Sequence, residues 1–333
     1  MTKLVSIDIG GTHARFALAS VADDGSIALG DVATLPTKDY ASFQTAWEGF
    51  AAMQNAPLPR AVSIAIAGPV GDPTDQSRVI RFTNNPWIIR PSLICEKLAV
   101  DRYTLVNDFG AVGHAVGYAV NWAGPEHFCH LSGPDVPLPA SGTLTIVGPG
   151  TGLGVAHLWR DGSAYRVQAT EGGHIDFAPL DSIEDAILAR LRTRHSRVSV
   201  ERVVSGPAIA DIYETLAALE GRAIAAVDDK TLWQNGTNGS DSLAAAAVDR
   251  FCLSLGSVAG DLALAQGASG VVIAGGLGLR IRDTLLASGF ASRFAAKGRF
   301  ASLMAKLPVK LITHPQPGLL GAAAAYYMEH AHD

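Results

Sequence analysis

Short apolar runs separated by glycine turns dominate the first part of the chain. Residues 4–9 have the pattern of a buried strand, and residues 14–19 that of its hairpin partner across Gly10-Gly11. The same arrangement returns later, with strands at 144–147 and 155–159 around a glycine turn at 148–154. We interpret the repeat as two copies of one strand–turn–strand unit, each of which heads its own α/β half.

The rest of the chain alternates further strands with helices, which dominate after the second glycine turn. Proline is tolerated at the first turn of a helix, and Gly206-Pro207 accordingly marks the start of one of them. The sequence predicts polar loops over 23–30 and 221–239. The further predicted strands are 61–67, 103–106, 270–276 and 308–312, and the predicted helices are 42–53, 109–119, 183–194, 208–219, 243–266 and 315–330.

Composition and charge narrow the class of protein. Hydrophobic residues make up 48% of the 333 residues and charged residues 17%, which allows a sizeable buried core. The formal net charge of −5 argues against nucleic acid or an anionic membrane as the main partner. The short basic cluster of Arg192, Arg194 and Arg197 is typical of a solvated face.

Cysteine usage and the N-terminus predict a cytoplasmic protein. The three cysteines, Cys95, Cys129 and Cys252, are widely spaced and form no C-x-x-C pair, so neither a disulfide framework nor a structural zinc site is implied. The chain enters a strand at once, without the pattern of a cleavable leader, and contains no uninterrupted apolar run of about 18 residues.

The two glycine turns are candidate phosphate sites. Glycine lets a ligand approach the main chain, where amide N–H groups can bind phosphate oxygens. An isolated Gly10-Gly11 would more simply be an ordinary hairpin turn. Here Asp8 and Thr12 flank it, and a related turn recurs at 150–152, which favours the functional interpretation.

Two common nucleotide signatures are not matched. A Walker A loop requires a lysine at the start of a helix, and no such lysine follows either turn. A dinucleotide fingerprint requires a helix after its glycines, whereas a strand is predicted after both turns, so hydride chemistry on NAD is disfavoured.

The motifs instead resemble a known family. The D-x-G-G-T stretch resembles the first phosphate loop of the superfamily that joins sugar kinases, actin and heat-shock chaperones. The stretches VNDFGAV, GPGTGLGVAHL, EGGHIDFAP, ERVVSGPAI, IAGGL and PGLLGAAA resemble, in that order, the bacterial glucokinase family, and the likeness spans Ile7 to about Ala324. His13 and Pro149 depart from the asparagine and alanine common in the family, and the cysteine-rich zinc motif of the related repressor and kinase group is not matched.

The resemblance implies a fold and an activity. The fold is a two-domain α/β actin-like ATPase (ribonuclease H-like) fold with an interdomain cleft, in which 1–110 and 316–333 form the smaller domain and 111–315 the larger. The activity is transfer of the γ-phosphate of MgATP to the 6-hydroxyl of glucose. The family also implies a cytoplasmic homodimer whose small-molecule partners are glucose and ATP.

Asp108 is the candidate catalytic base. It follows a predicted strand, where open α/β sheets commonly place ligands, and a carboxylate there can accept the proton of an attacking hydroxyl. By residue pattern alone, an N-cap aspartate that starts the next helix is an equal alternative. The resemblance favours the base, and it makes Asn107 a sugar ligand.

The remaining candidates are polar groups for the sugar. Glu171 and His174 flank two glycines and are expected to bind neighbouring sugar hydroxyls; a metal site is the alternative, but no third ligand has suitable spacing. Glu201 could be a solvent-facing helix charge, and the resemblance makes it a sugar ligand. Asn84 is a weaker candidate, because an asparagine close before a proline is also ordinary turn chemistry.

The nucleotide is expected at the glycines. Asp8 is predicted to orient the Mg²⁺ of ATP through water, with no protein side chain as a direct metal ligand. The threonines of the two turns can donate hydroxyls to phosphates, and a nucleotide can lie flat against the glycines that end the predicted strand 270–276. The predicted nucleotide residues besides Asp8 are Gly10, Gly11, Thr12, Gly150, Thr151, Gly152, Gly275 and Gly276.

Three other functions were weighed. A kinase for fructose, mannose or an amino sugar differs only in hexose preference. A sugar-binding regulator without turnover is disfavoured by the presence of Asp108 with both glycine turns, and by the absence of a DNA-binding segment before Thr2. An actin-like or chaperone-like assembly would have no use for sugar ligands.

Overall fold

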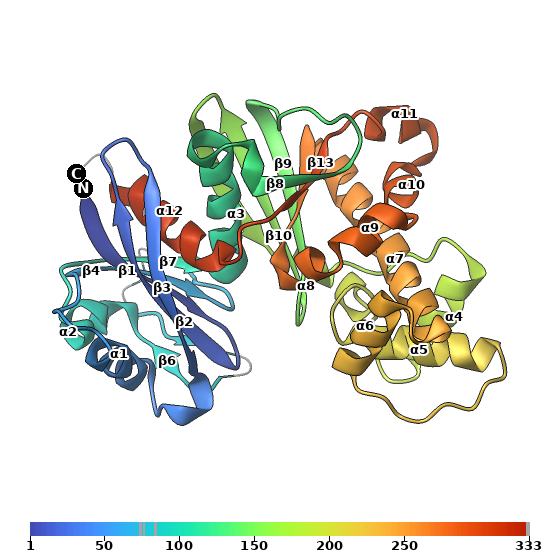
Figure 1. Ribbon diagram of the computed structural model, residues 1–333, viewed down its shortest axis with the longest axis horizontal. Helices are drawn as coiled ribbons and strands as arrows, with labels where there is room; N and C mark the ends of the chain where they lie inside the picture. Colours follow the sequence, from blue (N-terminus) through green and yellow to red (C-terminus); the bar gives the residue numbers. More distant parts are fainter. Residues whose placement is uncertain (73–74, 76, 83–84, 331–333) are drawn as a thin grey trace. The chain divides into compact units, whose positions relative to one another are not determined.

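The computed structural model describes residues 1–72, 75, 77–82 and 85–330 as two compact units. Unit 1 comprises Met1–Pro125, Val167–Ala169 and His314–Asp333, and unit 2 comprises Glu126–Arg166 and Thr170–Thr313. The smaller domain expected from the sequence ended at residue 110, which lies inside a helix that belongs entirely to unit 1. Figure 1 labels the elements of both units.

Unit 1 is built on a five-stranded sheet in the order β3-β2-β1-β4-β7. The first three strands form the predicted hairpin and one further antiparallel strand, while β4 and β7 run parallel to β1. Parallel strands place their carboxyl ends at one edge of the sheet. The strands are β1 (Thr2–Ile9), β2 (His13–Val21), β3 (Ile27–Pro36), β4 (Ala61–Ile66) and β7 (Arg102–Asn107).

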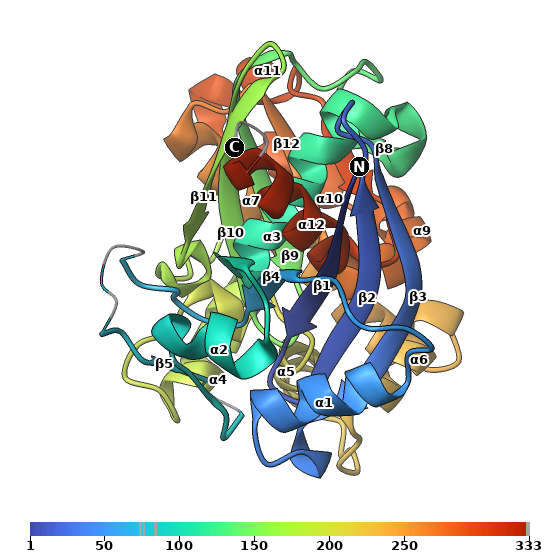
Figure 2. The same ribbon diagram turned by 90° about the vertical axis from the view of Figure 1, so that its left-hand side faces the viewer.

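Helices cover both faces of this sheet, as Figure 2 shows for α12 and α1. Side chains of a strand alternate between faces, so Ile7 joins the core under α1 and α2, whereas the Ser6 hydroxyl donates to the Leu319 carbonyl of α12 at 2.7 Å. Helix α12 packs closely on α3. Gly321 allows this close approach, since a Cβ at this position would collide with the Ala111 carbonyl. The helices are α1 (Phe43–Ala52), α2 (Ile94–Leu98), α3 (Asp108–Tyr118) and α12 (Pro317–His330).

Unit 2 repeats this plan on a six-stranded sheet in the order β11-β10-β9-β12-β13-β8. Strands β9 and β10 form an antiparallel hairpin, and β12 lies parallel to β9, as β4 does to β1. The predicted second copy of the strand–turn–strand unit is therefore confirmed. The strands are β8 (Phe128–Ser132), β9 (Ser141–Pro149), β10 (Leu153–Asp161), β11 (Ala164–Thr170), β12 (Gly270–Ile273) and β13 (Val309–Ile312).

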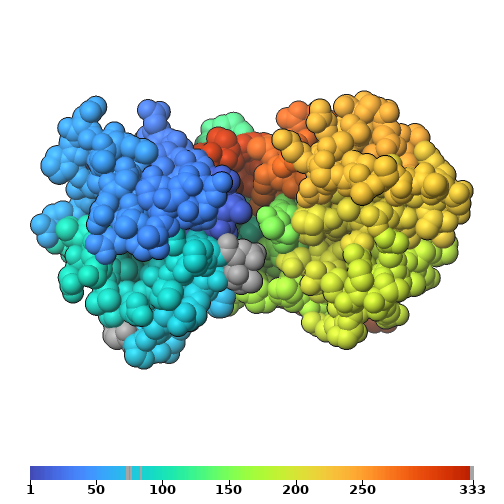
Figure 3. All heavy atoms as spheres, turned by 90° about the horizontal axis from the view of Figure 1, so that it is seen from below, coloured from blue at the N-terminus to red at the C-terminus, as the bar shows by residue number. Residues whose placement is uncertain are grey.

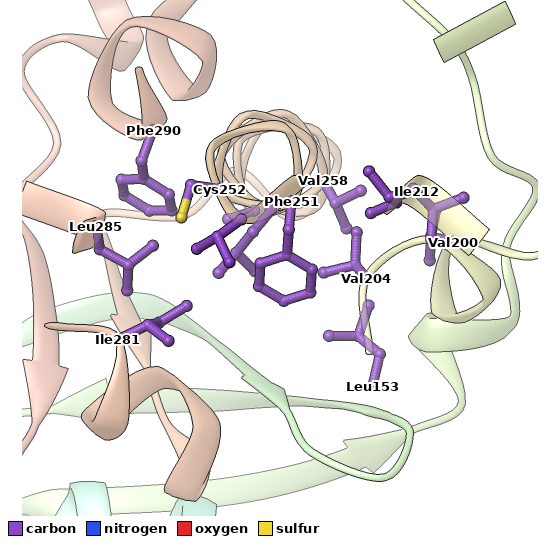
Figure 4. Packing of buried hydrophobic residues seen from close by; sticks show 14 of the residues in the cluster. Leu153, Val200, Val204, Ile212, Phe251, Cys252, Val258, Ile281, Leu285 and Phe290 are labelled. Atoms are coloured by element: carbon purple, nitrogen blue, oxygen red, sulfur yellow. The ribbon is translucent and has the colours of Figure 1, made fainter. Parts of the chain in front are cut away.

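The core of unit 2 surrounds the long helix α7 (Ser242–Gln266). Figure 4 shows Phe251, Cys252 and Val258 of this helix among apolar side chains from the flanking segments. The helix is long and apolar enough to cross a membrane, but 72% of its apolar 18-residue stretch is buried inside the protein, as expected of a core helix. In Figure 3 the face of unit 2 is formed largely by the yellow-green to yellow segments that include α4 and α5. The other helices are α4 (Ser182–Arg192), α5 (Ala208–Leu219), α6 (Asp229–Asn238), α8 (Gly275–Arg280), α9 (Arg282–Ala287), α10 (Phe290–Ala295) and α11 (Ala301–Met304).

Three local predictions were wrong. The predicted loop 23–30 contains the start of β3. Because most positions of this edge strand are exposed or only partly buried, its sequence lacks the alternation of apolar and polar residues that predicts a strand. The predicted loop 221–239 contains α6, a mostly polar helix that buries only Leu232, Trp233 and Gly236. The predicted strand 270–276 ends at Ile273, and its last two glycines instead begin α8.

Candidate functional site

The first glycine turn lies at the carboxyl edge of the sheet in unit 1. It joins β1 to β2, and the Gly10 N–H closes it by donating to the His13 carbonyl at 2.9 Å. Thr37 holds the turn from the side, since its hydroxyl donates to the Gly11 carbonyl at 3.0 Å and its N–H to the Thr12 carbonyl at 2.9 Å. The turn is thus positioned through its carbonyl groups.

Asp8 lies one strand position before this turn and faces the start of α12. A Cβ at Gly318 would lie 2.8 Å from its Oδ2, and Arg15, its register partner on β2, donates to the same oxygen at 3.1 Å. Burial raises the pKa of the Asp8 carboxyl, and the Arg15 guanidinium opposes that rise. A nearby cation would favour the carboxylate further, so Asp8 suits an indirect role beside the Mg²⁺ of a nucleotide. Within the described residues no group of three or more His, Cys, Asp or Glu side chains could hold a metal by itself.

Asn107 and Asp108 divide two roles at the start of α3. Asn107 is the N-cap: its Oδ1 accepts the N–H groups of Phe109 and Gly110 at 2.9 Å, and its Nδ2 donates to the Gly68 carbonyl at 3.0 Å. Asp108 is the first residue of the helix, half-buried, and its Oδ1 accepts the Phe109 N–H at 2.9 Å. The N-cap alternative for Asp108 is therefore wrong, because its neighbour caps the helix.

The second glycine turn joins β9 to β10 in unit 2. Within the turn, the Gly150 N–H donates to the Gly152 carbonyl at 2.8 Å. From outside, the Gly206 N–H donates to the Gly150 carbonyl at 2.7 Å, and Glu201 accepts the Leu153 N–H at 2.9 Å through Oε2. Glu201 is half-buried and belongs to the short 3-10 turn Val200–Arg202, so the solvent-facing helix charge considered from the sequence does not describe it.

Glu171 and His174 lie beside the same hairpin. Glu171 precedes the 3-10 turn Gly172–His174 that follows β11, and His174 is the last residue of that turn. The Glu171 Oε2 and His174 Nε2 atoms are 3.9 Å apart. Their side chains are 69% and 56% exposed, as sugar-facing groups need to be before a ligand binds. A Cβ at Gly173 would collide with the Leu153 carbonyl, so this segment touches the first residue of β10.

The glycines of α8 lie at the end of β9. Gly275 has φ of +86°, and a Cβ there would lie 3.0 Å from the Pro149 carbonyl. Gly276 has open space around its Cβ position. These glycines thus flank the second turn, as expected of a nucleotide site, although they begin a helix rather than end a strand.

Two residues near the site were missed from the sequence, and one candidate is not placed. Asn84 lies outside the described residues. Its neighbour Asn85 donates from Nδ2 to the Gly10 carbonyl at 3.3 Å and accepts the Trp87 N–H at 2.9 Å, which links Asn85 to the first turn. Arg15 could have been found by counting the hairpin register back from the glycines.

Two cavities differ in their relation to these residues. A cavity of about 500 Å³ in unit 1 is lined by residues such as Lys3, Arg60 and Tyr327, and none of the predicted site residues lines it. A cavity of about 330 Å³ in unit 2 is lined by Thr151 and Glu201 among others.

The fold and the site together define a class. Two α/β units that each contain a glycine-turn hairpin, one of them with a carboxylate at a strand end, are typical of phosphoryl-transferring enzymes of the actin-like superfamily. The family model described as Glucokinase matches residues 5–329, and the chain belongs to the glucokinase family.

Similar proteins agree with this assignment. A glucokinase from Zymomonas mobilis is 57% identical over 324 residues, which cover 97% of each chain. The crystal structure of a glucokinase from an Antarctic psychrotroph superposes with a TM-score of 0.83 at 31% identity and covers 98% of this chain and 99% of that one. The glucose complex of Balamuthia mandrillaris glucokinase has a TM-score of 0.79 at 20% identity over 97% and 93% of the two chains, which supports the fold alone.

Proposed function

We propose that this protein transfers the γ-phosphate of MgATP to the 6-hydroxyl of D-glucose and releases glucose 6-phosphate. Membership of the glucokinase family over residues 5–329 carries the proposal. The position of Asp108 supports it, because this carboxylate stands at the strand edge that also bears the first glycine turn.

In unit 1, Asp108 is the proposed general base. A helix N-terminus is a favourable place for a negative charge, which suits a carboxylate that accepts the proton of the sugar hydroxyl. Gly10, Gly11 and Thr12 hold phosphate oxygens, and Asp8 orients the metal through water. Mg²⁺ neutralises charge on the phosphates when the nucleotide is bound.

In unit 2, the proposal assigns some residues to the sugar and others to the nucleotide. Glu171, His174 and Glu201 accept or donate hydrogen bonds to sugar hydroxyls. In unit 1, the proposed sugar ligands are the remaining amide N–H of Asn107 and, as a further ligand, Asn84. Thr151 between its two glycines binds phosphate, and Gly275-Gly276 lies against the nucleotide.

The cellular setting is also part of the proposal. We infer a cytoplasmic homodimer, supported by the family and by the composition of the chain. Sedimentation equilibrium at micromolar protein checks the oligomer, and a monomer mass at all concentrations would contradict it.

The activity is tested by coupled ADP release with glucose, mannose, fructose, galactose and N-acetylglucosamine, each with and without Mg²⁺. We expect Mg²⁺-dependent turnover that is fastest with glucose. A faster rate with another hexose would identify a different sugar kinase, and sugar binding without turnover would identify a regulator.

A further inference from the structure

Three segments of unit 2 that are far apart in sequence meet at the second glycine turn. Gly206 binds the Gly150 carbonyl on one side, and Gly173 touches the Leu153 carbonyl on the other. The Val200 N–H donates to the Ile175 carbonyl at 2.9 Å, which ties the segment of Glu201 to the segment of His174. The groups proposed for the sugar are therefore attached to the backbone proposed for the phosphates.

Glu201 makes the side-chain contact in this arrangement. Its Oε2 accepts the Leu153 N–H at 2.9 Å and lies directly over Gly152, where any Cβ would collide with it. Within the described residues no hydrogen bond to Oε1 is present, so this second oxygen remains available to a ligand. The Glu201 carboxylate thus binds the end of the turn through Oε2 and can bind a ligand through Oε1.

We propose that Glu201 is a positioning residue for the second glycine turn, and that by binding the turn and the sugar with one carboxylate it couples glucose binding to nucleotide binding. This inference rests on the proposed function for the identity of the two ligands. It adds that the turn is ordered by a side chain that the sugar also contacts.

The coupling has a definite sign. A carboxylate hydrogen-bonded to sugar loses rotamer freedom, and the Leu153 N–H then meets an acceptor that is already ordered. Glucose should therefore tighten the binding of a nucleotide, and by linkage the nucleotide should tighten glucose to the same degree.

The experiment measures the Kd of Mg-AMPPNP by calorimetry, without glucose and with saturating glucose. In the wild type we expect glucose to lower this Kd. In Glu201→Ala the Kd without glucose should rise about tenfold, because a hydrogen bond to a charged group is lost, and the effect of glucose should vanish. Glu201→Gln keeps an acceptor for Leu153 and should restore most of the nucleotide affinity.

Glu171→Ala is the matched comparison. Glu171 is proposed to bind sugar, but it makes no hydrogen bond to the turn within the described residues. It should weaken glucose and leave the Kd of Mg-AMPPNP without glucose as in the wild type. If Glu201→Ala behaves in the same way, Glu201 is a sugar ligand only and the inference is wrong.

A second test uses the contact with Gly152. Its φ lies outside the left-handed region, so alanine suits the backbone, and its new Cβ displaces the Glu201 carboxylate. Gly152→Ala alone should weaken Mg-AMPPNP and speed amide exchange at Leu153. In the Glu201→Ala background the same change should weaken Mg-AMPPNP clearly less than it does alone, because the clash with the carboxylate has gone. Full additivity of the two changes would overturn the inference.

These outcomes are separate from the activity itself. If nucleotide affinity depends on Glu201 but no hexose is phosphorylated, the proposed function fails and the positioning role stands. If glucose is phosphorylated at an ordinary rate by a wild type whose nucleotide affinity ignores glucose, the coupling fails and the function stands.

Discussion

At the scale of single residues, the pair Asn107-Asp108 shows how neighbours divide structural and chemical work. Asn107 satisfies the first backbone donors of α3 and binds the Gly68 carbonyl, so its amide oxygen and one of its two amide N–H groups are committed to the fold. Asp108 is left at the first helical position, next to the partial positive charge of the helix end. The start of α3 therefore holds the Asp108 carboxylate in place, where it can serve as the proposed proton acceptor.

Asp108→Asn should lower kcat by about 10²-fold or more while the KM for glucose changes little, because only the proton acceptor is lost. Steady-state kinetics with varied glucose measures both constants. Asp283→Asn, at a side chain that is 84% exposed on α9, is the matched control and should keep wild-type turnover. Near-normal kcat in Asp108→Asn would contradict the assignment of the base.

We expect the ionised Asp8 side chain to lower the stability of the folded protein, and its proposed role beside a metal ion accounts for this. Because burial raises its pKa, the stability that this group contributes is present in acid and is lost as the pH rises through the folded-state pKa. The Asp8 side chain is 19% exposed, and we expect its charge to cost the free protein stability at neutral pH, at a site that suits a cation.

Asp8→Asn should therefore increase the free energy of unfolding at pH 7, and the gain should shrink as the pH falls toward about 4. The same change should lower kcat/KM by about tenfold or more, since an outer-shell metal partner is lost. Urea denaturation at several pH values measures the first effect.

The control for this prediction has a pKa shift of opposite sign. Hydrogen bonds from Ser26 lower the pKa of Asp24, so Asp24→Asn should show no gain at pH 7. A loss of stability in Asp8→Asn would mean that the ion pair with Arg15 outweighs the cost of burial.

At the scale of elements, the two adjacent glycines that begin α8 after β12 have different roles. Gly275 adopts φ of +86° and touches the Pro149 carbonyl, so it is needed for the backbone itself. Gly276 has neither constraint, and its bare surface remains available to a ligand.

Gly276→Val should raise the KM for ATP about tenfold with little change in the KM for glucose, because the branches occupy space that the nucleotide needs. Circular dichroism should show a wild-type fold. Gly275→Val should instead lose about 1–2 kcal/mol of stability, because a branched residue is strained at positive φ. Equal changes in both KM values for Gly276→Val would remove these glycines from the nucleotide site.

At the scale of the whole molecule, each unit carries one glycine turn, and the sugar candidates are divided between them. Asn107 and Asp108 belong to unit 1, whereas Glu171, His174 and Glu201 belong to unit 2. Discrimination between hexoses therefore tests the proposed sugar ligands of both units. Buried polar groups left unpaired cost about 1–3 kcal/mol each, so a sugar with an inverted hydroxyl should be rejected.

The kcat/KM for glucose should exceed that for fructose and galactose by well over about tenfold, since each 1.4 kcal/mol is a tenfold change. Glu171→Ala and His174→Ala should weaken glucose and narrow this gap. His130→Ala, at a half-buried histidine on β8, at the other edge of the sheet from β10 and β11, should preserve it. Equal treatment of the three sugars by the wild type would show that these residues do not select the hexose.

Periodic patterns within one segment were enough to predict much of the fold. The apolar runs at 61–67 and 103–106 became β4 and β7, and helix 208–219 has the bounds expected from its spacing. The repeated glycine hairpin was also visible in the sequence, because strand alternation and turn chemistry depend on neighbouring residues only. The family of the protein followed from the order of such motifs.

Only the tertiary structure showed how the candidates hold one another. Glu201 and Leu153 are separated by 48 positions, and no local pattern can pair a carboxylate with a backbone N–H so far away. The same holds for the hydrogen bond from Asn85 to the Gly10 carbonyl. It also holds for the start of α8, where Gly275 lies against the Pro149 carbonyl at the end of β9. Sequence by itself determined which residue types were present and in which elements; their mutual contacts were decided by packing, because packing alone brings distant segments together.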